Sequence, residues 1–185
     1  MTKTATRMLR LMDRAVTLWR IPVIGKEKSR VLRRLLLRHQ PRRGIEVGSL
    51  FGYSAILVAG HMPRGGRLVC VEQNAYLAKF VASNVEKAGL ARHVRVVVGD
   101  ALRVLPLLRG PVDFLLIDAN KEDYLDYLRA VESRLVKGAL VVADNTGMYR
   151  RDVKPYLDHV RNDPRYESRE HDFGFDCMEV SVFRG

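Results

Sequence analysis

From residue 44 onward, short runs of consecutive apolar residues alternate with longer segments whose apolar residues recur every three or four positions. Such runs are typical of strands buried on both faces, and the longer segments are typical of helices that pack on one side. The predicted strands are Gly44–Val47, Arg67–Glu72, Val94–Gly99, Val112–Asp118 and Ala139–Asp144. The predicted helices are Tyr53–His61, Ala75–Ala88, Leu102–Leu108, Tyr124–Val136 and Val153–Arg161. This alternation predicts an α/β fold with a doubly wound, mostly parallel sheet.

The pattern changes after Pro164, where apolar and polar residues alternate singly. The segments Tyr166–His171 and Cys177–Phe183 lie on either side of the glycine-containing stretch Phe173–Phe175. A period of two on both sides of a turn predicts an antiparallel hairpin, which would close the sheet at its C-terminal end.

The first 43 residues show helical periodicity instead. The first predicted helix, residues 6–20, carries along one side the apolar residues Met8, Leu11, Met12, Ala15, Leu18 and Trp19. We expect Pro22 to end it, because proline cannot continue the helical hydrogen bonds. A second helix is predicted from Glu27 to about His39 and is stopped by Pro41.

The positive charge of the chain is concentrated in these two helices. The formal net charge is +11, and residues 1–43 hold 13 Lys and Arg residues against two acidic ones, whereas the remaining 142 residues hold 19 of each sign. Any preference for an anionic partner is therefore expected in the N-terminal segment. Two explanations stay open, namely solvated basic faces on helices that pack against the domain, or contact with nucleic acid or another anionic surface.

Length and composition favour a single domain. A chain of 185 residues with 47% hydrophobic content can bury one substantial core. We therefore expect one domain over residues 1–185, with a basic helical cap over residues 1–43 and a core over residues 44–185. Cys70 and Cys177 lack the paired spacing of a zinc site and are expected to be free thiols.

The chain shows no apolar run near the roughly 18 to 20 residues that a membrane span needs. The N-terminus also lacks a signal-peptide pattern, because charged residues interrupt its apolar positions. We therefore expect a cytoplasmic protein.

The turn after the first core strand predicts a nucleotide-like ligand. The strand leads through Gly48 and Gly52 directly into a helix, which leaves free backbone N–H groups at the helix N-terminus. The spacing is G-x-x-x-G, preceded by Glu46, and differs from the G-x-G-x-x-G of dinucleotide-binding turns. This difference argues against NAD.

Acidic residues stand at the ends of the next two strands. Glu72 ends the second strand, where a carboxylate can accept hydrogen bonds from both hydroxyls of a ribose. The third strand ends in Gly99-Asp100-Ala101. Either Glu46 or Asp100 alone could simply cap a helix or pair with an arginine, but three acids at three successive strand ends favour an adenosine ligand.

Two further strand ends bring oxygen ligands to the same edge of the predicted sheet. Asp118 ends the fourth strand and Asp144-Asn145 ends the fifth. Two carboxylates and an amide oxygen, without histidine or cysteine, suit a hard divalent ion such as Mg²⁺. The simpler interpretation is that the two aspartates cap helices and the asparagine turns the chain.

Lys121, three residues beyond Asp118, is the candidate base. A like charge nearby disfavours the charged form of an amine, so a lysine beside a metal ion could accept a hydroxyl proton near neutral pH. The simpler interpretation is a solvated lysine at a helix start, which is an unfavourable place for a cation.

These motifs together resemble the metal-dependent O-methyltransferases of the catechol and caffeoyl-CoA type. The resemblance rests on Glu46–Ser54, Val71-Glu72, Gly99-Asp100-Ala101, Ile117–Lys121 and Ala143-Asp144-Asn145, and it extends over roughly residues 22–183. It implies a Rossmann-like domain that depends on S-adenosylmethionine. The cofactor-binding residues that it implies are Glu46, Gly48, Ser49, Tyr53, Ser54, Glu72, Gly99, Asp100, Ala101 and Asp118.

The resemblance also implies roles for individual residues. Gly48, Tyr53 and Ser54 would lie around the methionine part of the cofactor, Glu72 would bind its ribose, and Asp100 and Ala101 would lie by its adenine. The metal would be held by Asp118, Asp144 and Asn145, with Asp118 and Lys121 as the catalytic residues. The acceptor pocket would be shaped by Val23, Ile24, Lys28, Met148, Tyr149 and residues 171–176.

The identity of the methyl acceptor stays open between two hypotheses in which the protein is an enzyme. In the first, a metal ion holds a small catechol-like or phenolic hydroxyl in line with the sulfonium methyl, and the products are a methyl ether and S-adenosylhomocysteine. In the second, the acceptor is a hydroxylated base in tRNA, and the basic segment contacts phosphates. A third reading is a non-catalytic S-adenosylmethionine-binding protein. A homodimer is left open as well.

Overall fold

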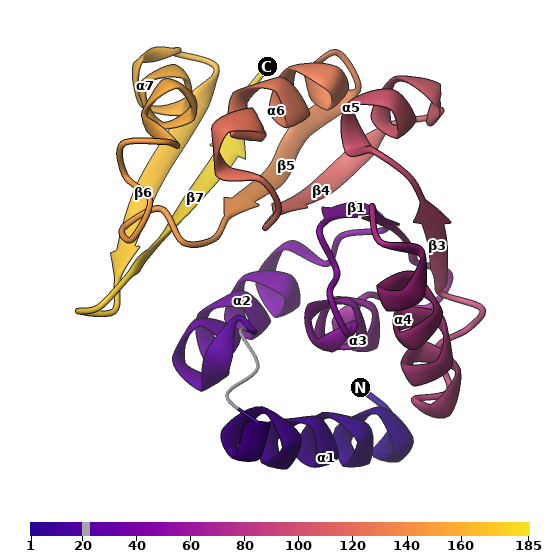
Figure 1. The fold of residues 1–185 in the computed structure, drawn as a ribbon. Coiled ribbons are helices and arrows are strands. Elements are labelled where there is room, and N and C mark those ends of the chain that lie inside the picture. Colours follow the sequence, from indigo (N-terminus) through magenta and orange to yellow (C-terminus); the bar gives the residue numbers. More distant parts are fainter. Residues whose placement is uncertain (20–22) are drawn as a thin grey trace.

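A computed structural model describes residues 1–19 and 23–185, and a mixed sheet of seven strands lies at its centre (Figure 1). The strand order is β3-β2-β1-β4-β5-β7-β6, with parallel pairing from β3 to β5 and antiparallel pairing for β7 and β6. The strands are β1 Arg43–Val47, β2 Arg67–Glu72, β3 Val94–Val98, β4 Val112–Ile117, β5 Leu135–Ala143, β6 Tyr166–Asp172 and β7 Cys177–Phe183. The predicted doubly wound fold with a closing hairpin is confirmed.

Helices cover both faces of the sheet. The lower layer in Figure 1 contains α1 Lys3–Trp19, α2 Gly25–His39, α3 Tyr53–His61 and α4 Ala75–Lys87. The upper layer contains α5 Ala101–Val104, α6 Tyr124–Glu132 and α7 Lys154–Asn162, with short 3₁₀ turns η1 Leu105–Leu107 and η2 Lys121–Asp123.

The last four residues of strand β4, Phe114 to Ile117, show why a strand in the middle of the sheet is apolar. Phe114 and Leu116 belong to the core under the lower layer of helices, whereas Leu115 and Ile117 belong to the core under the upper layer. Successive side chains of a strand point to opposite faces, so a strand covered on both sides needs an unbroken apolar run.

Two predicted helices are shorter than expected. The helix predicted over Tyr124–Val136 ends at Glu132, and the residues Leu135 and Val136 begin β5, because Leu135 pairs with Val112 of β4. The register then shifts before Leu140, and Gly138 has a φ of 85° that allows the strand to continue after this irregularity.

The helix predicted over Leu102–Leu108 is also wrong in its extent. It consists of the four-residue α5 and the 3₁₀ turn η1. Pro106 lies in that turn and has no N–H with which to continue an α-helical ladder.

Both predicted N-terminal helices form. The predicted end of the first helix, Arg20 and Pro22, lies outside the described residues. Helix α2 ends at His39, and its capping residue Gln40 adopts a left-handed conformation with a φ of 49°, one residue before Pro41. None of the helices within the described ranges combines the length and apolarity that a membrane crossing requires.

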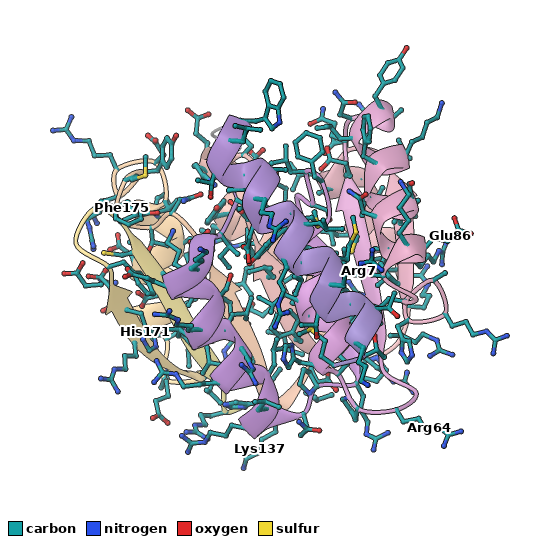
Figure 2. The ribbon with its side chains drawn as sticks, turned by 90° about the horizontal axis from the view of Figure 1, so that it is seen from below. Arg7, Arg64, Glu86, Lys137, His171 and Phe175 are labelled. Carbon is teal, nitrogen blue, oxygen red and sulfur yellow. The ribbon has the colours of Figure 1, made fainter. Side chains whose placement is uncertain are left out.

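The basic residues of this layer face outward, as Arg7 does in Figure 2. Eleven of the 13 Lys and Arg residues in the segment 1–43 are exposed, namely Lys3, Arg7, Arg10, Arg14, Lys26, Arg30, Arg33, Arg34, Arg38, Arg42 and Arg43. Arg20 is outside the described residues, and Lys28 alone of the described basic residues in this segment is buried.

Candidate active site

A cleft of about 450 Å³ opens along the C-terminal ends of the parallel strands. Connections from β1, β2, β4 and β5 all reach it, as expected for a ligand site in an open α/β sheet. Its lining includes Val23, Ile24, Gly48, Ser49, Tyr53, Ser54, Glu72, Gly99, Ala101, Asp118, Lys121, Asp144, Asn145 and Tyr149.

The glycine turn between β1 and α3 passes very close to the end of β4. Gly48 has a φ of 83°, and a Cβ atom built on it would lie 2.2 Å from the backbone oxygen of Asp118. The Glu72 carboxylate accepts hydrogen bonds from the backbone N–H groups of Ser49 (3.1 Å) and Leu50 (3.0 Å). Glu72 therefore holds the turn in place and also faces the cleft.

Two of the predicted cofactor-binding residues do not line the cleft. Glu46 is fully buried beneath it, where Ser54 Oγ donates to Oε1 and Cys70 Sγ donates to Oε2 at 3.1 Å. Burial raises the pKa of the Glu46 carboxyl to about 7. Asp100 instead caps α5, since its side chain accepts a hydrogen bond from the N–H of Leu102 at 2.9 Å.

The predicted oxygen ligands and the predicted base do come together. Lys121 Nζ lies 2.9 Å from Asp118 Oδ1 and 3.0 Å from Asn145 Oδ1, so these two oxygens converge on one point. Lys121 Nζ also donates to Tyr124 Oη at 2.8 Å and lies 5.6 Å from the centre of the Tyr149 ring. The end of the cleft near Lys121 thus has polar groups on one side and an aromatic ring on the other.

The backbone continues the sheet ladder as far as the two aspartates. The N–H of Asp118 donates to the Val47 oxygen at 2.9 Å, and that of Asp144 donates to the Ile117 oxygen at 3.0 Å. Asn145 follows with a left-handed φ of 58°, a conformation that asparagine tolerates better than most residues. The three side chains are therefore placed by rigid strand ends, and two carboxylates with one amide oxygen fit a hard divalent cation.

Lys28 does not line the cleft, contrary to the expectation that it shapes the acceptor pocket. It is 4% exposed, and its Nζ lies 2.5 Å from Asp144 Oδ1 and 2.6 Å from Asp176 Oδ2. Of its predicted neighbours, Val23 and Ile24 line the cleft. The position of Lys28 matters because it neutralises a buried carboxylate at the predicted metal site.

Asp176 was expected only as one residue of a pocket loop, and the structure makes it the centre of a hydrogen-bond network. Burial tends to raise its pKa, but hydrogen bonds from Lys28, Asn145 and backbone N–H groups lower it to about 2. Asp144 shows the opposite shift, because burial and the nearby charge of Asp118 raise its pKa to about 6 against the effect of Lys28. Asp176 is therefore ionised at neutral pH.

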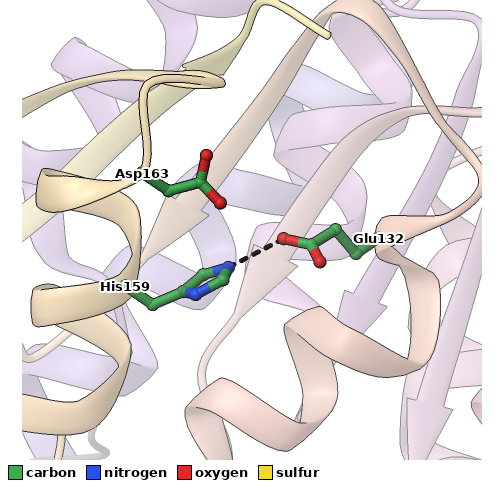
Figure 3. Close-up of side chains that lie close together, drawn as sticks. All are labelled: Glu132, His159 and Asp163. Carbon is green, nitrogen blue, oxygen red and sulfur yellow. Dashed lines mark hydrogen bonds and ion pairs between the residues drawn. The ribbon is translucent and has the colours of Figure 1, made fainter.

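A second group of polar side chains, at α6, α7 and the start of β6, lies away from the cleft (Figure 3). His159 Nε2 lies 2.8 Å from Glu132 Oε1, and the Tyr166 hydroxyl donates to the same oxygen at 2.7 Å. Asp163 binds the guanidinium of Arg165. These carboxylates already have partners, and the group joins two helices to the hairpin.

Comparison with known proteins identifies related chains. Residues 4–164 match the family described as O-methyltransferase. A catechol O-methyltransferase of Niastella koreensis is 33% identical over 126 residues, which cover 66% of this chain and 57% of that protein. One of Mycobacterium tuberculosis is 40% identical over 107 residues, which cover 57% of this chain and 49% of that protein. The chain thus spans about half the length of these curated relatives.

Solved structures agree with the fold. The O-methyltransferase TomG from Streptomyces achromogenes, in complex with SAM, superimposes with a TM-score of 0.86 at 25% identity. The match covers 100% of this chain and 91% of that one.

Proposed function

Since this chain belongs to the O-methyltransferase family, we propose that it transfers the methyl group of S-adenosylmethionine to a hydroxyl oxygen of a small catechol-like or phenolic acceptor, assisted by a divalent metal ion. One observation carries the proposal. A single cleft is lined both by the glycine turn with Glu72 and by Asp118, Lys121, Asp144 and Asn145. The residues proposed to bind the cofactor and those proposed to carry out the reaction would therefore lie side by side, and we call them the cofactor part and the reacting part of the cleft.

The cofactor part would be formed by the turn from Gly48 to Ser54, the carboxylate of Glu72, and the Gly99-Ala101 connection. Glu72 already accepts three hydrogen bonds from backbone N–H groups, those of Ser49, Leu50 and Asn74. Ionised carboxylates have about four acceptor sites, so capacity remains for a ribose hydroxyl. Glu46 and Asp100 would not contact the cofactor themselves. Glu46 would hold Ser54 in place, and Asp100 would cap α5.

In the reacting part, Asp118, Asp144 and Asn145 would hold a hard divalent ion such as Mg²⁺, which when bound would orient the acceptor oxygens and acidify the hydroxyl. Lys121 would take the hydroxyl proton at Nζ. The new bond joins the acceptor oxygen to the methyl carbon as the bond from that carbon to sulfur breaks, which yields a methyl ether and S-adenosylhomocysteine. Val23, Ile24 and Tyr149 offer apolar surface to an aromatic acceptor.

A tRNA base is the second candidate acceptor, and the eleven exposed basic residues of the segment 1–43 favour it. We rank it second, because no aromatic stacking pattern accompanies these arginines in the sequence.

One assay separates these functions. Labelled methyl from S-adenosylmethionine is offered to a panel of catechols and phenols, and separately to undermodified bulk tRNA, with Mg²⁺ and with a chelator. We expect labelling of a catechol that chelator abolishes. Undiminished labelling in chelator contradicts metal assistance, and labelling confined to tRNA reassigns the acceptor. Cofactor binding without any labelling supports a non-catalytic protein.

A further inference from the structure

Four side chains form a buried charged network behind the reacting part of the cleft. They are Lys28 from α2, Asp144 and Asn145 after β5, and Asp176 just before β7. Lys28, Asp144 and Asp176 are 4%, 1% and 2% exposed. Burying one ammonium and two carboxylates is costly unless their geometry is well satisfied, so the arrangement of this network requires an explanation.

Asp176 fixes the orientation of the Asn145 amide. Asp176 Oδ2 accepts a hydrogen bond from Asn145 Nδ2 at 2.8 Å, so the amide oxygen, Oδ1, faces the other way and reaches Lys121 at 3.0 Å. The other oxygen, Asp176 Oδ1, accepts from the backbone N–H groups of Gly147, Met148 and Cys177. One carboxylate therefore holds both the side chain of Asn145 and the chain that follows it.

Lys28 fixes Asp144 in a similar way. Its Nζ lies 2.5 Å from Asp144 Oδ1, and the N–H of Asn145 donates to the same oxygen at 2.8 Å. Both contacts use Oδ1, which leaves Oδ2 as the oxygen available to a ligand. Lys28 also joins Asp144 to Asp176, so the two orienting contacts depend on each other.

We propose that Lys28 and Asp176 are positioning residues that set the orientation of Asp144 and Asn145, two of the three side chains expected to hold the metal ion. The inference rests on the proposed function. Neither residue lines the cleft, so their effect is exerted through the two side chains that do.

The test removes the pair without changing the net charge of the site. In the double variant K28M/D176N, one positive and one negative charge are lost together. Mn²⁺ binding is measured by electron paramagnetic resonance in the presence of S-adenosylhomocysteine, and binding of S-adenosylhomocysteine itself is measured by calorimetry. We expect Mn²⁺ affinity to fall tenfold or more, while the affinity for S-adenosylhomocysteine stays within twofold of that of the unaltered protein.

The single variant K28M shows whether Lys28 acts by orienting Asp144 or through its charge, because the two mechanisms change Mn²⁺ affinity in opposite directions. Removing a cation next to Asp144 would by itself tighten binding of a divalent ion, whereas loss of orientation weakens it. We expect weaker binding. The matched control is R161M/E179Q, which removes an ion pair of 2.6 Å between Arg161 of α7, whose side chain is 37% exposed, and the buried Glu179 of β7. It lies outside the cleft and should leave Mn²⁺ affinity within twofold.

Mn²⁺ affinity unchanged or increased in K28M and K28M/D176N overturns the inference and leaves the proposed function intact. If the unaltered protein does not bind Mn²⁺, both the metal assistance and this inference fail, and the methyl-transfer assay still tests the remaining function. If thermal melts show that the methionine variants do not fold, K28R decides, because it keeps the charge and changes the geometry. Weaker Mn²⁺ binding in K28R supports the inference, and equal binding overturns it.

Discussion

At the scale of single residues, neighbouring carboxylates in this molecule differ because their partners differ. Glu46 has only weak donors, Ser54 and a thiol, and its pKa is raised by burial. Asp176 is also buried but accepts five hydrogen bonds, and its pKa is lowered. The hydrogen-bond partners of a buried carboxyl group, and not its burial alone, therefore determine the direction in which its pKa shifts.

Glu46 should make the protein less stable as pH rises. Its pKa of about 7 in the folded chain exceeds the ordinary value of 4.5, so between these pH values the folded state binds the extra proton. The free energy of unfolding then falls by about 1.4 kcal/mol per pH unit, on the order of 3 kcal/mol in all. This contribution is complete below pH 4.5 and lost above pH 7.

The glutamine variant E46Q isolates this effect, because it cannot ionise. Urea unfolding of both proteins at several pH values between about 4.5 and 8 gives the difference in their free energies of unfolding. We expect the unaltered protein to lose stability relative to E46Q as pH rises. A difference that stays constant over this range would contradict the raised pKa.

Lys121 should act as a proton acceptor and not only as a cation. The variant K121M is expected to lower kcat by roughly 10²- to 10⁴-fold, the usual contribution of a general base. K121R is the control, because arginine keeps the charge but does not give up its proton at working pH. Steady-state kinetics of labelled-methyl transfer to the acceptor should show both variants impaired, with the affinity for S-adenosylhomocysteine unchanged. Activity close to normal in K121R would assign Lys121 an electrostatic role instead.

At the scale of elements, the candidate site lies at the C-terminal ends of the parallel strands, and the sequence predicts the positions of these strand ends well. Continuous apolar runs located the five parallel strands, and Asp118 and Asp144 each follow a strand by one residue. The start of β5 was missed because Leu135 and Val136 continue the helical spacing of α6, and only their pairing with β4 makes them a strand. The Lys28–Asp176 pair was missed because 148 residues separate its members and neither has a local signal.

Two glycines, Gly48 just after β1 and Gly138 within β5, test how closely neighbouring backbones must approach. Gly48 and Gly138 have nearly the same φ, 83° and 85°, but only a Cβ at Gly48 meets a neighbouring backbone, whereas a Cβ at Gly138 meets nothing within 4 Å. G138A should therefore lose only about 1 kcal/mol of stability from the unfavourable conformation. G48A should lose clearly more, since β1 and β4 must separate.

Urea unfolding and calorimetric titration with S-adenosylhomocysteine measure both consequences. We expect G48A to bind the ligand weakly, because its turn lines the cleft, and G138A to bind it normally. Equal losses of stability in the two variants would show that the contact with the Asp118 backbone is not limiting.

At the scale of the whole molecule, the basic surface of the N-terminal segment and the candidate active-site cleft lie in different places. Nine of the eleven exposed basic residues of the segment 1–43 lie on α1 and α2, whereas the cleft lies at the ends of the strands. For a small phenolic acceptor this surface is not part of the reaction. For an RNA acceptor it would supply much of the affinity.

The dependence of the reaction on salt distinguishes these cases. With a phenolic acceptor, we expect kcat/KM to stay within twofold between about 50 and 300 mM NaCl and to be unaffected in R33E/R34E. The control R64E/R92E makes the same change of charge at exposed arginines outside the segment 1–43. A steep loss with salt, larger in R33E/R34E than in the control, would indicate that phosphates are bound by α2.

The Lys28–Asp176 contact also has a consequence for biosynthesis. The support for Asp144 and Asn145 needs a lysine from α2 and an aspartate that is synthesised 148 residues later. The reacting part of the cleft is therefore completed only after the final hairpin has been synthesised and has docked. A nascent or truncated chain that ends before Asp176 would therefore lack the contacts that orient Asp144 and Asn145.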